Sequence, residues 1–174
     1  YYTIFESDFT RRQPRNRNVV DSRGRTLSRV TSEFFNGLVL EGSGKLVDGR
    51  VLNYHTNIGG THRFLVSPHP WGNGAGDCGL KPFRTIAVDR RVIPLGAVVY
   101  IDETVGMILP DGSHHDGRWR ADDVGGAIDH DRVDLYVGKR NWNSFLSAHG
   151  IRHLQPLRVR ILRQPDGESC AYRA

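Results

Sequence analysis

Apolar and polar residues alternate with a period of two through much of the second half of the chain, as they do in strands with one buried face. Sequences rich in glycine or proline interrupt this alternation and mark turns. We predict β-strands over residues 85–88, 97–101, 119–122 and 132–137. A last strand is expected near the end, where Leu157, Val159 and Ile161 alternate with arginines. Together these strands should form a barrel.

Two short segments have the spacing of helices instead. Thr31 or Ser32 can cap a helix whose aromatic residues fall on one face, and Gly42 is placed to end it. A second helix is expected over residues 141–148, before Gly150. We assign the aromatic face of the first helix to the core and not to a ligand.

The first thirty residues have a pattern of their own. A short strand, a basic loop and a hairpin turning at residues 21–24 predict an N-terminal β extension over residues 1–30. We expect it to pack on a single globular domain of residues 31–174. Within that domain, a hairpin around Asp48 and Gly49 leads into a long loop at residues 68–76, rich in proline and glycine. Loops of this kind often carry function.

Composition and charge narrow these expectations. With 20 glycines and 8 prolines among 174 residues, the chain fits a mainly β domain better than a helical bundle. The formal net charge is +5, and the excess lies early, at Arg11, Arg12, Arg15, Arg17, Arg23, Arg25 and Arg29. This basic run is either a solvated face or a surface for an anionic partner such as a cell wall. No nucleic-acid module is recognisable, so we expect no nucleic-acid partner.

The two cysteines, Cys78 and Cys170, match no zinc-binding spacing. A disulfide between them is plausible and would contribute on the order of 4 kcal/mol through the unfolded state, although two free thiols are the alternative. No apolar run has membrane-spanning length, so we expect no membrane insertion. Because the chain starts at Tyr1 without methionine, we expect a removed leader and an extracellular or periplasmic location.

The strongest chemical signal is an aspartate inside a predicted strand. In residues 132–137 the apolar Val133, Leu135 and Val137 share one face, which puts Asp134 and Tyr136 on the other. Aspartate is disfavoured in strands, so we expect Asp134 to perform a specific task.

Two further aspartates stand at predicted strand ends. Asp123 precedes Gly125 and Gly126, whose backbone can come close to a ligand. Asp89 precedes two arginines that could keep it ionised. The three carboxylates could converge at one rim, although an aspartate at a strand end is also a common turn cap.

Several ordered motifs resemble a known family. They are Ile86-Ala87-Val88-Asp89, Val92-Ile93-Pro94-Leu95-Gly96, Ala121-Asp122-Asp123-Val124-Gly125-Gly126-Ala127-Ile128 and Val133-Asp134-Leu135-Tyr136-Val137-Gly138. In this order they resemble the three-aspartate (3D) domain, which also forms the core of membrane-bound lytic transglycosylase A. The resemblance extends over roughly residues 31–162 and implies a six-stranded double-psi β-barrel with one or two short helices.

The resemblance also implies an activity. Such enzymes break the bond between N-acetylmuramic acid (MurNAc) and N-acetylglucosamine (GlcNAc) in the peptidoglycan glycan strand without water, leaving a 1,6-anhydro ring. Asp134 matches the essential acid, which would later act as a base, and we expect Asp123 to stay ionised beside it. Predicted substrate contacts are Gly125, Gly126, Tyr136, Lys81 and Trp71.

One departure from the family could alter substrate choice. After the segment ending at Ile128 the family usually has lysine and glycine, where this chain has Asp129 and His130.

Two other functions are compatible with the same residues. A hydrolytic endoglucanase on the same barrel and a non-catalytic, expansin-like wall-binding module both fit a glycan groove. The histidines at 55, 62, 69, 114 and 115 form no recognised ligand motif, so we predict no metal and no cofactor. A serine or cysteine nucleophile lacks its motif. We expect a monomer.

Overall fold

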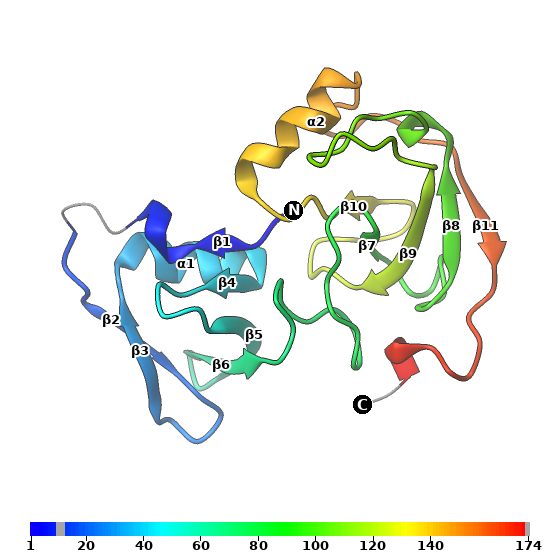
Figure 1. Cartoon of the computed structure of the whole chain (residues 1–174). Coiled ribbons are helices and arrows are strands. Elements are labelled where there is room, and N and C mark those ends of the chain that lie inside the picture. Colours follow the sequence, from blue (N-terminus) through cyan, green and yellow to red (C-terminus); the bar gives the residue numbers. More distant parts are fainter. Residues whose placement is uncertain (10–12, 173–174) are drawn as a thin grey trace. The chain divides into compact units, whose positions relative to one another are not determined.

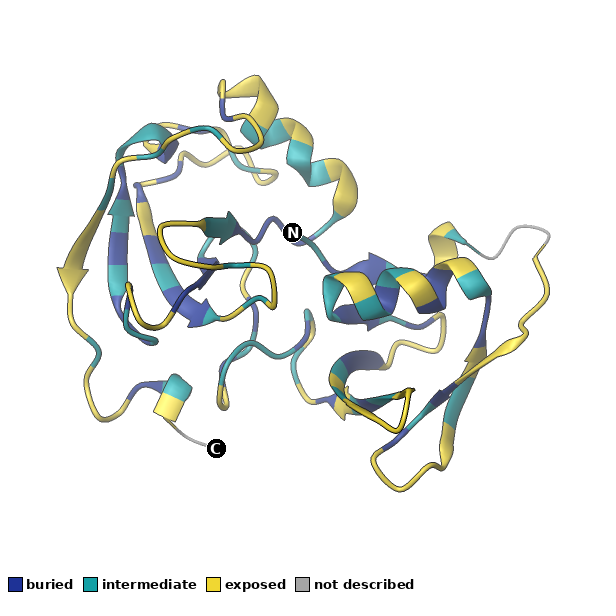
Figure 2. Cartoon of the chain, turned by 180° about the vertical axis from the view of Figure 1, so that it is seen from behind, coloured by how far each residue is buried: buried dark blue, intermediate teal, exposed yellow. Residues whose placement is uncertain are grey.

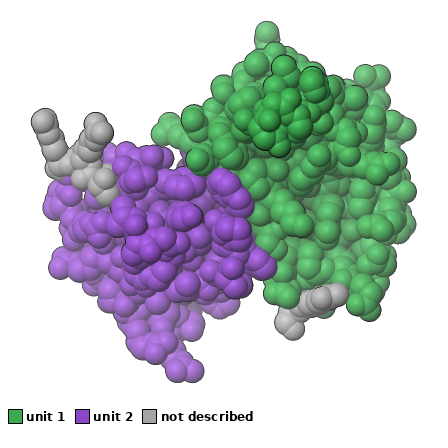
Figure 3. All heavy atoms as spheres, in the orientation of Figure 1, with its two compact units in different colours: residues 1, 74–174 green, residues 2–73 purple. Residues whose placement is uncertain are grey.

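The computed structural model describes residues 1–9 and 13–172 and is mainly β with two α-helices, which confirms the predicted class (Figure 1). Arg11 and Arg12 of the basic run lie outside these residues. The chain divides into two compact units, coloured in Figure 3: unit 2 is Tyr2–Asn73, and unit 1 is Tyr1 together with the chain from Gly74 onward. The two compact units thus divide between residues 73 and 74. The domain boundary expected after residue 30 stays a prediction.

Unit 2 is built on a six-stranded sheet in the order β1-β4-β5-β6-β2-β3. Its strands are β1 Ile4–Phe5, β2 Arg17–Val20, β3 Thr26–Val30, β4 Ser43–Lys45, β5 Val51–Ile58 and β6 Thr61–Ser67, and a 3-10 helix η1 covers Glu6–Asp8. Antiparallel pairing of β2 with β3 and of β4 with β5 confirms both predicted hairpins. Strand β6 was missed, because polar residues at its start weaken the alternation.

Helix α1, Ser32–Glu41, lies in unit 2 and has the predicted ends. The Thr31 side chain accepts a hydrogen bond from the Phe34 nitrogen at 3.2 Å, and Gly42 ends the helix with a φ of 80°. Phe34, Phe35 and Leu38 are buried, as Figure 2 shows for one face of the helix. Fully burying such a side chain contributes about 1.5–3 kcal/mol, so this face is core, as predicted.

Unit 1 is built on a five-stranded sheet in the order β10-β7-β9-β8-β11. Its strands are β7 Thr85–Val88, β8 Val98–Ile101, β9 Arg118–Asp123, β10 Val133–Leu135 and β11 Val159–Arg163. Strands β7 and β9 run parallel and the other neighbours antiparallel. Every predicted strand is present, but over the described part of the chain they form a row with two ends, so the closed six-stranded double-psi barrel is not confirmed.

Shorter elements complete unit 1. They are the 3-10 helices η2 Asp102–Thr104, η3 Arg140–Trp142 and η4 Cys170–Tyr172, and helix α2 Asn143–Ala148. A disulfide joins Cys78 to Cys170 across 92 positions, which confirms the predicted pairing and ties η4 to the loop before β7. Among the helices that the structure describes, none has the length and apolarity to cross a bilayer.

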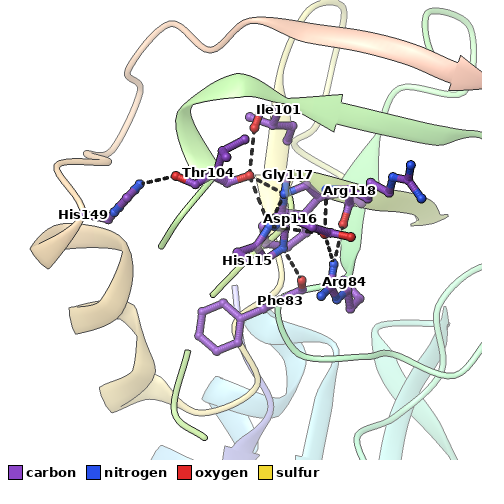
Figure 4. Close-up of polar contacts among 11 residues, drawn as sticks. Phe83, Arg84, Ile101, Thr104, His115, Asp116, Gly117, Arg118 and His149 are labelled. Atoms are coloured by element: carbon purple, nitrogen blue, oxygen red, sulfur yellow. Dashed lines mark hydrogen bonds and ion pairs between the residues drawn. The ribbon is translucent and has the colours of Figure 1, made fainter. Parts of the chain in front are cut away.

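A polar network in unit 1 surrounds the buried His115 (Figure 4). Its Nδ1 accepts from the Gly117 nitrogen at 2.9 Å, so Nε2 carries the proton and donates to the Phe83 carbonyl at 2.7 Å. The ring stacks on Trp119 at 4.6 Å between centroids. Burial lowers the pKa of His115, so its ring is neutral and its role is structural.

Candidate active site

The register of the unit 1 sheet brings Asp123 and Asp134 to one level. Ala87, in strand β7 between β10 and β9, pairs with Asp134 of β10 on one side and with Asp123 of β9 on the other. Paired residues on neighbouring strands point to the same face, and strands lie about 4.8 Å apart, so the two aspartate Cα atoms are about 10 Å apart on one face. Between them in the sheet lies the small side chain of Ala87.

Asp123 is held at the end of β9 by hydrogen bonds. The Val124 nitrogen donates to its Oδ1 at 2.8 Å, and the Tyr1 hydroxyl donates to its Oδ2 at 2.7 Å. Burial raises the pKa of Asp123 to about 7, against these two hydrogen bonds, which lower it; the charges of Asp122 and Asp134 raise it further. A carboxyl group with such a pKa can hold a proton near neutral pH.

Asp134 has a more open position. Its side chain is 46 % exposed, and the Tyr1 nitrogen lies 3.1 Å from its Oδ1. Tyr1 therefore contacts both members of the pair, while Asp134 is the member with surface for a substrate.

These surroundings correct the division of protonation expected from the sequence. We predicted that Asp123 stays ionised and that Asp134 holds the proton. Burial raises the pKa of Asp123 to about 7, so Asp123 itself can hold a proton near neutral pH.

The structure places Asp89 in a different role. Its side chain is only 6 % exposed, and both oxygens accept bonds from the Arg91 guanidinium, joined by the Arg91 and His130 nitrogens at 2.9 Å each. Arg91 holds the pKa of Asp89 well below its usual range. Arg91 also pairs with Asp129 at 2.9 Å, so Asp129 and His130, which depart from the family pattern, help to anchor this loop. Asp89 is thus occupied as a structural anchor.

The two glycines follow β9, and Gly125 is half-buried while Gly126 is exposed. The Ile128 nitrogen donates to the Gly125 carbonyl at 3.0 Å, and a Cβ at Gly125 would collide with the Ile128 side chain. Around Gly126 nothing lies within 4 Å of an added Cβ, so its backbone is open to a ligand. Lys81 is exposed, and its charge opposes the effect of burial, which raises the pKa of Asp122. Its predicted substrate contact stays a prediction.

Two other predicted contacts have different surroundings. Tyr136 is fully buried and packs its ring on Tyr1 at 5.0 Å between centroids, so its side chain supports the site and offers no surface to a glycan. Trp71 belongs to unit 2, where its carbonyl accepts from the Thr3 hydroxyl and its ring packs on Phe5. The structure thus corrects the prediction for Tyr136 and adds Tyr1, which no sequence pattern indicates.

Asp122 points to the face opposite Asp123 and is a structural carboxylate. It is buried and pairs with Arg120 at 3.0 Å. Its carboxylate and the sulfurs of Cys78 and Cys170 lie within 4.8 Å of one another, the sole group of potential metal ligands found in residues 1–9 and 13–172. Both sulfurs are used by the disulfide, so this group does not fit a metal ion.

The 3D domain family matches residues 84–144. The chain contains a 3D domain. That domain holds Ala87, Asp89, Asp123 and Asp134, together with β7 to β10, so the family match and the site coincide. No curated protein matches the sequence.

Solved structures that resemble the chain contain this fold in a larger protein. A membrane-bound lytic murein transglycosylase from Agrobacterium tumefaciens is 18% identical with a TM-score of 0.52, covering 71% of this chain and 49% of that one. MltA from Neisseria gonorrhoeae is 17% identical with a TM-score of 0.55, covering 86% and 47%. The chain as a whole therefore spans about half the length of these proteins and shares their fold.

Proposed function

We propose that this protein is a lytic transglycosylase that cleaves the MurNAc-GlcNAc β-1,4 bond of the peptidoglycan glycan strand without water. The observation that carries the proposal is the pair Asp123 and Asp134, placed on both sides of Ala87 within the 3D domain. One member is exposed to a substrate, and the other shifts proton binding toward neutral pH. The fold of the two solved transglycosylases supports the same activity.

The pair can supply both proton transfers of this reaction. Asp134, the exposed member, donates a proton to the bridging oxygen, and the bond from that oxygen to C1 of the muramyl residue breaks. The muramyl C6 hydroxyl then attacks C1, and the same carboxylate takes its proton as the 1,6-anhydro ring closes. The nucleophile belongs to the substrate, so the second carboxyl group that hydrolysing enzymes need for water is not required. Asp123 beside it holds a proton up to about pH 7, because burial raises its pKa.

Substrate contacts and location follow from the same proposal. The open backbone at Gly126 and the exposed Lys81 are candidates to bind acetamido and carboxylate groups of the strand. A long-range disulfide is typical of secreted proteins, which supports an extracellular or periplasmic location. We propose that the chain acts as a monomer and that a double-psi arrangement of the unit 1 strands frames the glycan.

Digestion of purified sacculi by the native protein and by Asp134→Asn tests the activity. The substitution removes proton transfer while nearly preserving shape, so we expect release of soluble muropeptides to fall by about 10²–10⁴-fold. Asp131→Asn, a change at an exposed aspartate three residues earlier, is the matched control and should keep native activity.

Mass analysis of the fragments decides between the alternatives. Anhydro ends carry one water less than reducing ends, so reducing ends would identify a hydrolase such as an endoglucanase. Retention of the protein on sacculi with no fragments released would identify an expansin-like binding module. Either outcome overturns the transglycosylase proposal.

A further inference from the structure

Tyr1 is fixed next to the carboxylate pair by its backbone. Its nitrogen donates to the Leu135 carbonyl at 3.0 Å, and its carbonyl accepts from the Val137 nitrogen at 3.0 Å. A residue of a parallel strand makes these two bonds with the neighbours of the residue that it faces, so Tyr1 faces Tyr136. The two side chains therefore share a face, and their rings are in contact at 5.0 Å between centroids.

The Tyr1 side chain ends at the pair. Its hydroxyl donates to Asp123 Oδ2 at 2.7 Å, a bond between residues 122 positions apart. The other oxygen of Asp123 accepts from the Val124 nitrogen, so the carboxyl group is held from two directions. The Tyr1 side chain is only 13% exposed and packs on Tyr136, which removes the freedom that a surface tyrosine would have.

We propose that Tyr1 is a positioning residue for the Asp123–Asp134 pair. The Tyr1 hydroxyl fixes the orientation of Asp123 and favours the ionised form of that carboxyl group. This inference rests on the proposed function for its effect on catalysis. Tyr1 acts through Asp123 and needs no contact with the glycan, so its removal should lower kcat and leave KM almost unchanged.

The direction of the electrostatic effect follows from the groups around Asp123. Burial raises its pKa most, and the charges of Asp122 on the same strand and of Asp134 on β10 raise it further. The Tyr1 hydroxyl is the side-chain donor that opposes them. Without this donor the ionised form of Asp123 loses a hydrogen bond, so its pKa rises.

The test is Tyr1→Phe in the full chain, which removes one oxygen and keeps the ring on Tyr136. We expect kcat for sacculi digestion to fall about tenfold, the loss of roughly one charge-assisted hydrogen bond. The midpoint at which kcat falls on the alkaline side should move upward by about one pH unit. Tyr172→Phe is the matched control, because Tyr172 is 56% exposed, and it should change neither value.

A second measurement does not depend on activity. Titration of carbon-13-labelled aspartate followed by NMR reports the Asp123 midpoint directly, and Tyr1→Phe should raise it. If the native protein releases no anhydro fragments but the midpoint rises, the proposed function fails and the positioning role stands. If the native protein is active and Tyr1→Phe leaves both the midpoint and kcat unchanged, the positioning role is overturned.

Discussion

Two carboxylates of unit 2 have partners of a different kind from those of Asp123 in unit 1. In unit 2, Glu6 is paired with Arg15 at 2.9 Å and Asp21 with Arg25 at 2.7 Å. In unit 1, within the residues that the structure describes, Asp123 forms no ion pair with arginine or lysine, and its partners are a tyrosine hydroxyl and a backbone amide.

The consequences for proton binding are opposite. Against the effect of burial, hydrogen bonds and charge from Arg25 lower the pKa of Asp21, whereas burial raises the pKa of Asp123 to about 7. A carboxylate locked by arginine stays ionised at every working pH and serves the fold. A carboxyl group without that cation can gain and lose a proton in the range where enzymes work, which is why perturbed groups of this kind mark functional sites.

Replacing Asp123 or Asp21 by asparagine tests this contrast with the largest expected effect. Asp123→Asn should lower the release of anhydro fragments by about 10²–10⁴-fold, because the pair loses a titrating member. Its thermal stability should hold or rise at neutral pH, since a costly ionised group is gone. Asp21→Asn should do the reverse, with a lower melting temperature and native activity per folded molecule. Equal loss of activity in both variants would contradict the contrast.

The pH dependence of stability should have opposite signs at the two sites. Asp123 has a raised pKa in the folded state, so its stabilising contribution is complete below its ordinary pKa of 3.8 and is lost as pH rises through about 7. Asp21 has a lowered pKa, so its contribution is present above 3.8 and is lost as pH falls.

Melting curves of the native protein and the two asparagine variants isolate these contributions. Between pH 5 and pH 8 the native protein should lose about 2 kcal/mol relative to Asp123→Asn. His115, whose pKa is lowered, acts in the other direction below its ordinary value but is common to both proteins and cancels in the difference. A pH-independent difference would show that Asp123 does not titrate in this range.

The sequence predicts the elements of this fold better than it predicts the site. The cap at Thr31 and the short β-forming run at 85–88 are local signals, and the helix and the strand that they predict are both present. Asp134 stands out because its residue type conflicts with its strand. The register that sets Asp123 and Asp134 beside Ala87 depends on pairing between distant strands, which no local pattern encodes.

Burial was the second quantity that local patterns could not supply. Alternation placed Tyr136 on the open face with Asp134, but Tyr1, from the other end of the chain, covers it. The same contact gives Asp123 its tyrosine partner. Asp89 was correctly expected to meet an arginine, yet only the structure shows that this arginine and the His130 nitrogen occupy the carboxylate completely.

The smallest expected effect concerns the space between the two carboxyl groups. Ala87 is buried with 3% exposure between Asp123 and Asp134, and Ala87→Val adds two methyl groups at that position. Overpacking of this kind costs about 1–3 kcal/mol of stability. Because the added methyl groups face the pair, we also expect kcat to fall about tenfold, the cost of a modest misplacement of one carboxyl group.

Ala97→Val is the matched control, since Ala97 is equally buried in unit 1 but pairs with neither aspartate. It should lower the melting temperature to a similar degree and keep kcat. If both variants lose stability and neither loses kcat, the distance between the carboxyl groups does not limit the reaction, and Asp134 acts without Asp123.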